Sequence, residues 1–294
     1  MLSRLILMLL VVVAAVPTLQ AQPKGQYVRG LSQSAVIDQK KGDAVLKTFR
    51  NQRLQGDFLF QFEMTSMPPR RGESKTLSYQ GKMWGRWQEG RLASRFLIYP
   101  GGESSKRLRR PLPKDPKAYT GFLSYNGDDT KIWKYSPNAS SEPFELVDKA
   151  LFEPLLPGLE LSAFDLQMSF IFWPNYTYEG IDPTRRTVHS FLMEPPAHLK
   201  QIHPDLDRVR IYIEGRFHAL TKVEILNPKG KPLRTLKVRK FKKIDGRYIV
   251  KEIDFFDERT RRKTRFKVID AQFKHGLPET FFSPEDLPNL SQKR

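Results

Sequence analysis

The sequence predicts a mostly β (α+β) protein, with an antiparallel sheet and a few short helices. Phe58, Phe60 and Phe62 alternate with Leu59 and Gln61, and a period of two residues is typical of a strand with one packed face. Short apolar runs separated by turn residues recur in the second half of the chain. The dipeptide at positions 245–246, Asp-Gly, is a strong signal for a β-hairpin.

The first 21 residues predict a secretory signal peptide. Arg4 precedes an apolar run from Leu5 to Val16, and small residues follow up to Ala21. The run has about a dozen residues, whereas a membrane-spanning helix needs roughly 20. We therefore expect cleavage near Ala21, export to the periplasm, and one domain over residues 22–294. The chain has no cysteine, so we expect neither disulfides nor a lipid anchor on this chain.

The first elements after the signal peptide change from helix to strand. Residues 34–50 have a loosely helical pattern that Lys40-Lys41-Gly42 interrupts, which predicts one or two short helices. The alternating strand from Phe58 follows. The next strands are expected around Tyr79–Met83 and Leu92–Ile98, with a turn at residues 88–90 between them.

The middle of the chain contains a basic loop and an apolar segment. Residues 100–116 are rich in Gly, Pro and Arg without an apolar period, so we expect a long surface loop, with Lys106–Arg110 as its densest positive patch. Residues 144–173 are apolar and poor in Lys and Arg. Ser162 is either the cap of a helix or the start of a strand, because the residues after it fit both periods.

The second half predicts an antiparallel meander from Val188 onwards. Charged and apolar residues alternate in it, so one face of each strand is expected to be packed and the other solvated. The expected strands are Val209–Ile213, Leu220–Leu226, Leu233–Phe241, Tyr248–Phe256 and Thr264–Ile269.

The net charge of the chain indicates which classes of partner to expect. There are 50 Lys and Arg against 32 Asp and Glu, which gives a formal net charge of +18. Such a field attracts anionic membrane surfaces, polyanions or acidic envelope proteins, although it also serves to keep an exported β protein in solution. Nucleic acid is not expected as a partner, because the export signal sends the chain away from it and no nucleic-acid-binding signature is present.

No motif in the sequence indicates an enzyme, a metal site or a cofactor. The five histidines do not have metal-ligand spacing, and no nucleophile elbow, P-loop or dinucleotide-binding fingerprint occurs. Asp128 and Asp129 could supply carboxylates to a hydrolase. They follow Asn126-Gly127, however, and this composition is typical of a hairpin turn.

Three segments of the sequence carry motifs of one known family. Asn126–Pro137 resembles a turn and strand of the form D-G-x-x-x-W-x-Y-x-P. Leu161–Leu166, with Trp173 beyond it, is similar to an S-x-x-D-L segment, and Lys222–Leu226 and the strands up to Phe281–Pro284 look like closing strands of the same family. In these segments the sequence resembles bacterial outer-membrane lipoprotein-sorting proteins, the LolA-like periplasmic carriers.

The resemblance implies a strongly curved antiparallel sheet, an incomplete barrel around an apolar cavity with short helices as a lid. It implies a carrier that binds the acyl chains of lipoproteins or lipids, works in outer-membrane lipoprotein sorting and meets envelope transport proteins. The cavity lining would comprise Phe58, Phe60, Phe62, Phe96, Ile98, Trp133 and Tyr135. Candidates for the lid and the cavity mouth are Arg91, Arg95, Phe164 and Met168. The alternative is an envelope structural or assembly factor with a filled core that acts through its basic surface.

Overall fold

The computed structural model describes residues 38–54, 56–69, 76–88, 91–100, 119–127, 130–182, 185, 187–274 and 276–289. Several sequence-based predictions lie outside these residues. They are the signal peptide, the basic loop around Lys106–Arg110 and the pair Asp128 and Asp129.

One antiparallel sheet of 13 strands dominates the described structure. Its order is β6-β5-β4-β3-β2-β1-β13-β12-β11-β10-β9-β8-β7, so that two meanders meet where β1 pairs with β13. The first meander contains β1 (Asp57–Met67), β2 (Ser78–Gln88), β3 (Arg91–Pro100), β4 (Thr120–Asn126), β5 (Lys131–Tyr135) and β6 (Phe144–Glu145). The second contains β7 (Tyr176–Ile181), β8 (Val188–Met193), β9 (Arg208–Glu214), β10 (Ala219–Leu226), β11 (Pro232–Ile244), β12 (Arg247–Asp257) and β13 (Lys263–Lys274).

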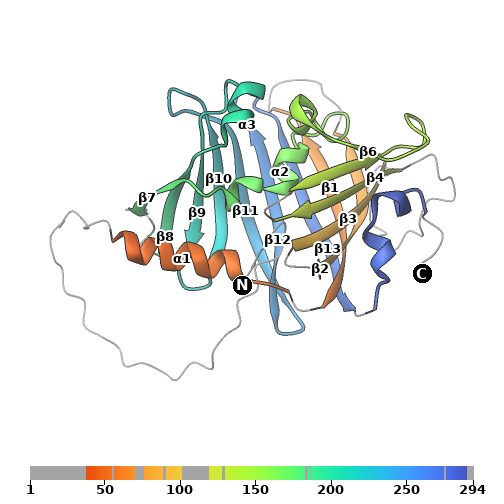
Figure 1. Cartoon of the computed structure of the whole chain (residues 1–294), viewed down its shortest axis with the longest axis horizontal. Coiled ribbons are helices and arrows are strands. Elements are labelled where there is room, and N and C mark those ends of the chain that lie inside the picture. Colours follow the sequence, from red (N-terminus) through yellow and green to blue (C-terminus); the bar gives the residue numbers. More distant parts are fainter. Residues whose placement is uncertain are drawn as a thin grey trace.

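The sheet curves without closing, because β6 and β7 are its two ends and do not pair with each other. Figure 1 shows the strongly bent sheet with short helices beside it. The predicted incomplete barrel with a helical lid is therefore confirmed. The helices are α1 (Gln39–Asn51), α2 (Ala163–Gln167) and α3 (Ala197–Ile202), and the short 3₁₀ turns are η2 (Asp148–Leu151), η3 (Ser169–Phe172), η4 (Glu279–Phe282) and η5 (Pro284–Asp286).

Helix α1 continues through the position where the sequence predicted an interruption. Asp38 caps it by accepting a hydrogen bond from the backbone N–H of Lys41. Gly42 lies directly against the ring of Tyr178, and a Cβ at this position would come within 2.4 Å of that ring. The glycine therefore permits close packing of α1 on β7, and of the two predicted alternatives, one helix or two, the structure has the single helix.

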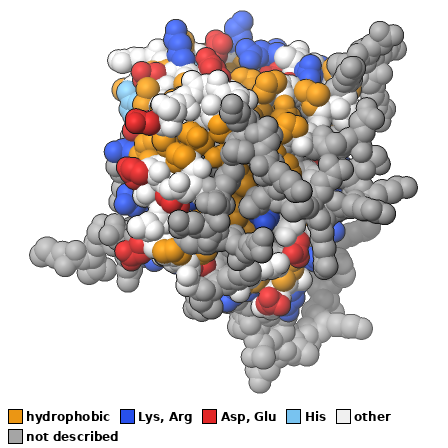
Figure 2. All heavy atoms as spheres, turned by 90° about the vertical axis from the view of Figure 1, so that its right-hand side faces the viewer, with side chains coloured by type: hydrophobic (Ala, Val, Ile, Leu, Met, Phe, Trp, Pro, Cys, Tyr) orange, Lys and Arg blue, Asp and Glu red, His pale blue; other side chains and the backbone are white. Residues whose placement is uncertain are grey.

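The core lies on the inner face of the bent sheet. The inner core is a continuous cluster of buried apolar side chains that receives residues from α1, α2 and both meanders. We call residues 276–289 the C-terminal segment. A smaller outer cluster lies on the opposite face of the sheet, where Phe281, Phe282 and Leu287 of this segment pack on Ala93 of β3 and Leu123 of β4. Figure 2 shows hydrophobic side chains gathered at the centre of the side of the molecule that carries the C-terminal segment in Figure 1.

None of the helices in the described residues is long and apolar enough to cross a bilayer.

Candidate functional site

The candidate site is built around residues 160–174, which we call the lid segment. It links the first meander to the second and contains α2 and η3. Ser162 and Asp165 form a capping box, in which the Asp165 carboxylate accepts from the Ser162 N–H at 2.8 Å and the Ser162 hydroxyl accepts from the Asp165 N–H at 3.3 Å. The structure thus selects the helical alternative for Ser162. Helix α2 ends at Met168, whose φ of 46° turns the chain into η3.

Apolar side chains of the lid segment fill the interior of the bent sheet. Phe164, Met168 and Phe170 are each at most 2% exposed and belong to the inner core. The ring of Phe164 lies 4.8 Å from that of Phe152 and 5.6 Å from that of Phe170, measured between centroids. The predicted lid residues Phe164 and Met168 therefore do lie in a segment that covers the inner face of the sheet.

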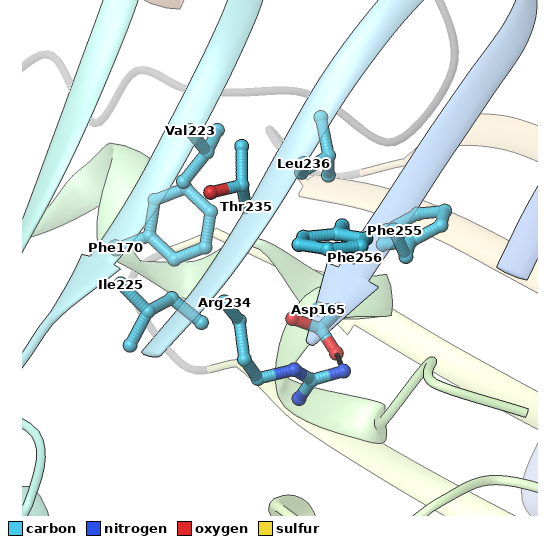
Figure 3. Close-up of a pocket in the computed structure, with 9 residues that line it drawn as sticks. All are labelled: Asp165, Phe170, Val223, Ile225, Arg234, Thr235, Leu236, Phe255 and Phe256. Atoms are coloured by element: carbon cyan, nitrogen blue, oxygen red, sulfur yellow. Dashed lines mark ion pairs between the residues drawn. The ribbon is translucent and has the colours of Figure 1, made fainter. Parts of the chain in front are cut away.

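Arg234 of β11 holds the first half of the lid segment. Its guanidinium forms an ion pair with Asp165 at 2.5 Å and donates to the Ser162 hydroxyl at 3.1 Å and to the backbone carbonyl of Glu160. Figure 3 shows this ion pair beside a pocket of about 10 Å³ between Phe170 and the apolar side chains of β10–β12. The pocket has room for about one water molecule, so this part of the interior is filled.

Arg50 and Asn126 hold the second half of the lid segment. Arg50, in the last turn of α1, donates to the carbonyl of Ile171 at 2.7 Å and to that of Trp173 at 2.9 Å. The side chain of Asn126, at the end of β4, donates to the carbonyl of Gln167 at 2.9 Å. The lid segment is therefore tied to α1 and to both meanders by a small number of polar contacts.

Burial shifts the pKa of two side chains at the lid segment, those of Arg50 and Glu160. The pKa of Arg50 is lowered by burial, although the charge on Tyr176 acts in the opposite direction. The pKa of Glu160 is raised, chiefly by burial and also by Asp257, and the nearby arginines only partly offset this. The carboxylate of Glu160 lies 3.1 Å from Nε of Arg262. The start of the lid segment is thus a site where charge is costly unless it is paired.

Two larger pockets border the lid segment. One has a volume of about 520 Å³ and lies between Phe164, Phe172 and Trp173 of the lid segment, the end of β4, and Pro196–Leu199 at α3. The other has a volume of about 210 Å³ and lies near Glu160, His203 and Arg234. The first of these falls within the size range of small-molecule sites, roughly 300–1,000 Å³.

The structure brings together five of the seven side chains predicted to line a cavity. Phe58, Phe60, Phe62, Phe96 and Ile98 are all buried in the inner core. The ring of Phe62 lies 4.6 Å from that of Phe266 and 6.4 Å from that of Phe96. The rings of Phe58 and Phe60 are 4.8 Å apart.

Trp133 and Tyr135 lie on the other face of the sheet. Both pack against the outer cluster, whereas Ile132, the residue before Trp133 in β5, belongs to the inner core. Successive side chains of a strand point to opposite faces, so β5 cannot present all three to one cavity. This placement corrects the expectation that the seven side chains share one surface.

Arg91 and Arg95 also face the outer side of the sheet. Arg95 is 4% exposed and donates to the carbonyls of Phe281 and Asp286 and to the Asp286 carboxylate. Arg91 lies over the ring of Tyr125, with 4.5 Å between the guanidinium carbon and the ring centroid. Arg95 therefore fixes the C-terminal segment, whereas Arg50, Arg234 and Arg262 contact the lid segment.

The sequence contained a partial signal for the ion pair between Arg234 and Asp165, which was not among the sequence-based predictions. Arg234 and Asp165 both fall within segments that resemble the lipoprotein-sorting family, but they are far apart along the chain. Only the tertiary structure shows that they pair. In the described residues, no three histidine or acidic side chains are grouped so that they could hold a metal ion.

Comparison with solved structures identifies the fold. A DUF1329 family protein from Desulfovibrio piger has a TM-score of 0.65 at 16% identity, and the alignment covers 84% of this chain and 98% of that one. An outer membrane lipoprotein-sorting protein domain from Vibrio parahaemolyticus has a TM-score of 0.64 at 16% identity, with 85% and 97% covered. A LolA superfamily protein from Nitrosomonas europaea has a TM-score of 0.53 at 15% identity, with 85% and 98% covered. The fold is LolA-like.

A family model described as an uncharacterized protein family matches residues 112–289, which is more than half of the chain. The chain belongs to this family. No curated protein matches the sequence. The matched residues begin ahead of β4 and end in the C-terminal segment, so they include the lid segment and Arg234, whereas Arg50 on α1 lies outside them.

Proposed function

We propose that this protein is an exported, periplasmic carrier that shelters the acyl chains of lipoproteins or lipids beneath the lid segment, as part of outer-membrane lipoprotein sorting. One observation carries the proposal: the interior of an open, bent sheet is filled by a separate apolar segment that a few polar contacts hold in place. An acyl chain has the same apolar character as the lid side chains that it would replace. The LolA-like fold supports this proposal.

The energetics permit such an exchange. Each methylene group removed from water contributes about 0.8 kcal/mol, so a chain of about 16 carbons contributes on the order of 12 kcal/mol. A hydrogen bond contributes about 1 kcal/mol net, and one to a charged group roughly 1.5–3 kcal/mol. The contacts made by Arg50, Arg234 and Asn126 therefore sum to an energy of the same order as the one that an acyl chain supplies.

The proposed pathway starts at the 520 Å³ pocket. This pocket already reaches Phe164, Phe172 and Trp173 of the lid segment. An acyl chain that enters there and displaces Phe164, Met168 and Phe170 would contact Phe62, Phe96 and the other buried aromatic side chains of the inner core. The charge on a lipoprotein or lipid head group would stay outside, because burying an unpaired charge is costly.

A single cysteine in the lid segment tests this proposal. The chain has no cysteine of its own, so Phe172→Cys can be labelled with an environment-sensitive dye. Adding a long-chain fatty acid should change the emission of the dye in a saturable way. Lys229→Cys is the control, because Lys229 is an exposed residue of the turn between β10 and β11 and should give no change.

A second function is favoured by the filled interior. Phe58, Phe60 and Phe96 are completely buried, as expected for an envelope assembly factor that acts through its basic surface. That protein would keep the lid segment closed. A flat dye signal at Phe172→Cys, together with no fatty acid retained in native mass spectrometry, would support the assembly factor and reject the carrier.

A further inference from the structure

The hairpin formed by the end of β11 and the start of β12 extends beyond its neighbours in the sheet. Strand β10 pairs with β11 as far as Lys237, and the pairing of β12 with β13 begins at Glu252. From these positions to the end of the hairpin, where Ile244 lies opposite Arg247, the described residues of β11 and β12 pair only with each other. Figure 1 shows this hairpin projecting at the lower edge of the molecule.

The conformation of the hairpin is fixed by its sequence. Asp245 and Gly246 have φ of 48° and 77°, the positive values that a two-residue type I′ turn requires. The register shifts on both sides of Lys240, and such bulges increase the twist of a strand. The hairpin is thus a defined structural element and not an irregular loop.

The hairpin concentrates positive charge. Residues 239–251 contain six lysines and arginines and a single aspartate. The five consecutive residues from Arg239 to Lys243 are all exposed. Lys240 is paired with Glu252 at 3.3 Å, but among the described residues no carboxylate pairs with Lys242 or Lys243.

Two exposed aromatic rings accompany these charges. Phe241 is 40% exposed in the middle of the basic run, and Phe217 in the neighbouring turn between β9 and β10 is 48% exposed. The ring of Phe217 lies 6.2 Å from that of Tyr248, and Tyr248 is paired with Lys243 across the hairpin. Exposed phenylalanines do not help solubility, so solvation alone does not account for this surface.

We propose that this surface, residues 239–248 together with Phe217, docks the protein on an anionic phospholipid bilayer. Lysines and arginines lie near the phosphate groups, and the two phenylalanine rings enter the boundary between head groups and acyl chains. Exposed phenylalanines beside exposed lysines suit a bilayer, whose head groups are anionic and whose interior is apolar, better than a nucleic acid strand that needs a groove with stacking platforms. The proposal goes beyond acyl binding, because the hairpin lies outside the lid segment and its docking does not require a bound chain.

Vesicle co-sedimentation tests the proposal. The protein should bind vesicles that contain phosphatidylglycerol and should bind vesicles of phosphatidylcholine alone much more weakly. Each lysine near an anionic surface accounts for about fivefold in affinity. The variant Lys242→Ala/Lys243→Ala should therefore bind about 25-fold more weakly, and Phe241→Ser should also lose binding.

The matched control is Lys229→Ala/Lys231→Ala. These two lysines are exposed at the opposite end of β11, and replacing them removes as much positive charge as the variant in the hairpin does. The control should bind anionic vesicles within about twofold of the unchanged protein. Equal losses in the two double variants would overturn the proposal, and so would vesicle binding that does not depend on anionic lipid, or selective binding of single-stranded DNA in place of vesicles.

The docking surface and the carrier function can be tested separately. The hairpin variant should still take up fatty acid in the absence of vesicles, as reported by the dye at Phe172→Cys. Thermal unfolding of each variant checks that the fold is retained, which we expect because Lys242 and Lys243 are exposed. If the hairpin variant loses vesicle binding but still takes up fatty acid, membrane docking is located on the hairpin. If the unchanged protein takes up no fatty acid, the carrier function is rejected and the docking proposal still stands.

Discussion

Arg234 is the residue on which the position of the lid segment depends most. Its guanidinium joins β11 to the carboxylate of Asp165, whose side chain is only 6% exposed. Removing one partner of a buried pair leaves the other charge without compensation. The same arginine also satisfies the hydroxyl of Ser162, so it supports the capping box at the start of α2.

Replacing Arg234 should therefore destabilise the fold. We expect Arg234→Ala to lower the free energy of unfolding by about 2–3 kcal/mol, because a buried charge-assisted contact is lost. Urea unfolding measures this change. Arg239→Ala on the same strand is the control: its side chain is 46% exposed and lies 3.9 Å from Asp254, so it should cost less than about 0.5 kcal/mol. Similar losses in the two variants would contradict the role assigned to Arg234.

His189 should make stability depend on pH. Burial lowers its pKa, the charges of Lys41 and His218 act in the same direction, and Glu214 opposes them. The hydroxyl of Tyr178 lies 2.8 Å from Nδ1 of its ring. The unfolded chain, with a histidine pKa of about 6.5, therefore takes up a proton before the folded protein does.

The sign of the dependence follows from this order of protonation. The contribution of His189 to stability is fully present above the unfolded pKa and is lost as pH falls through the folded pKa. We expect the free energy of unfolding to decrease between about pH 7.5 and pH 5, with a smaller decrease in His189→Gln. His218 retains part of the slope, because burial also lowers its pKa. An unchanged slope in His189→Gln would show that other groups cause it.

At the scale of elements, the C-terminal segment is a second covering layer, on the outer face. Arg95 donates to its carbonyls, and Asp57 accepts from the N–H of Leu277 at 2.9 Å while it pairs with Arg86 at 2.7 Å. Burial alone would raise the pKa of Asp57, but the hydrogen bonds from Arg86 and Leu277 outweigh it and the pKa is lowered. The lid segment thus packs on the inner face of the sheet, and the C-terminal segment packs on the part of the outer face that β2–β5 form.

Loss of Arg95 should release the C-terminal segment without unfolding the sheet. In Arg95→Ala, limited proteolysis should cleave within residues 276–289 several-fold faster, because a few long-range contacts hold this short segment in place. Lys134→Ala on β5 is the control and should leave the cleavage rate unchanged. If Arg95→Ala instead lowers protection of β1 and β13 by hydrogen exchange, the segment is part of the global folding unit.

At the scale of the whole molecule, positive charge exceeds negative charge by a wide margin. The formal net charge is +18. Carboxylates relieve part of this charge locally. Asp254 is one example: it pairs with Arg265 at 2.7 Å and with Lys263 at 3.4 Å on the neighbouring strand. The remaining self-repulsion disfavours the compact state.

Screening should therefore stabilise the folded protein. Raising NaCl from about 0.01 M to about 0.15 M shortens the Debye length from roughly 30 Å to roughly 8 Å. We expect the midpoint of thermal unfolding to rise, and the affinity for anionic vesicles to fall, over the same range. Chloride is used because sulfate strengthens apolar burial independently of charge. A falling midpoint would show that local ion pairs outweigh the repulsion.

Much of the fold could be predicted because each strand carries its own pattern. The alternation from Phe58 to Phe62, the Asp245–Gly246 turn and the meander after Val188 gave strands close to those observed. The resemblance to the lipoprotein-sorting family added the curvature of the sheet. The sequence left open whether α1 is one helix or two, because the helical pattern does not show that Gly42 packs against Tyr178.

The candidate site could be predicted only in part. The sequence placed Phe164 and Met168 in the lid and five apolar side chains on one inner face. It proposed Arg91 and Arg95 for the lid and the cavity mouth, whereas both lie on the outer face and the lid segment is held by Arg50 and Arg234. Which arginine reaches which partner depends on how the two meanders meet, and no local pattern records that.

The sequence by itself determined what short-range rules control: the mostly β class, the positions of most strands and turns, the net charge, and the absence of cysteine. The tertiary structure decided what depends on contacts between distant residues. It paired β1 with β13, put Trp133 and Tyr135 on the outer face, and joined Arg234 to Asp165. The physical reason is that alternation assigns side chains to two faces of a strand, whereas only the bend of the whole sheet decides which face becomes the interior.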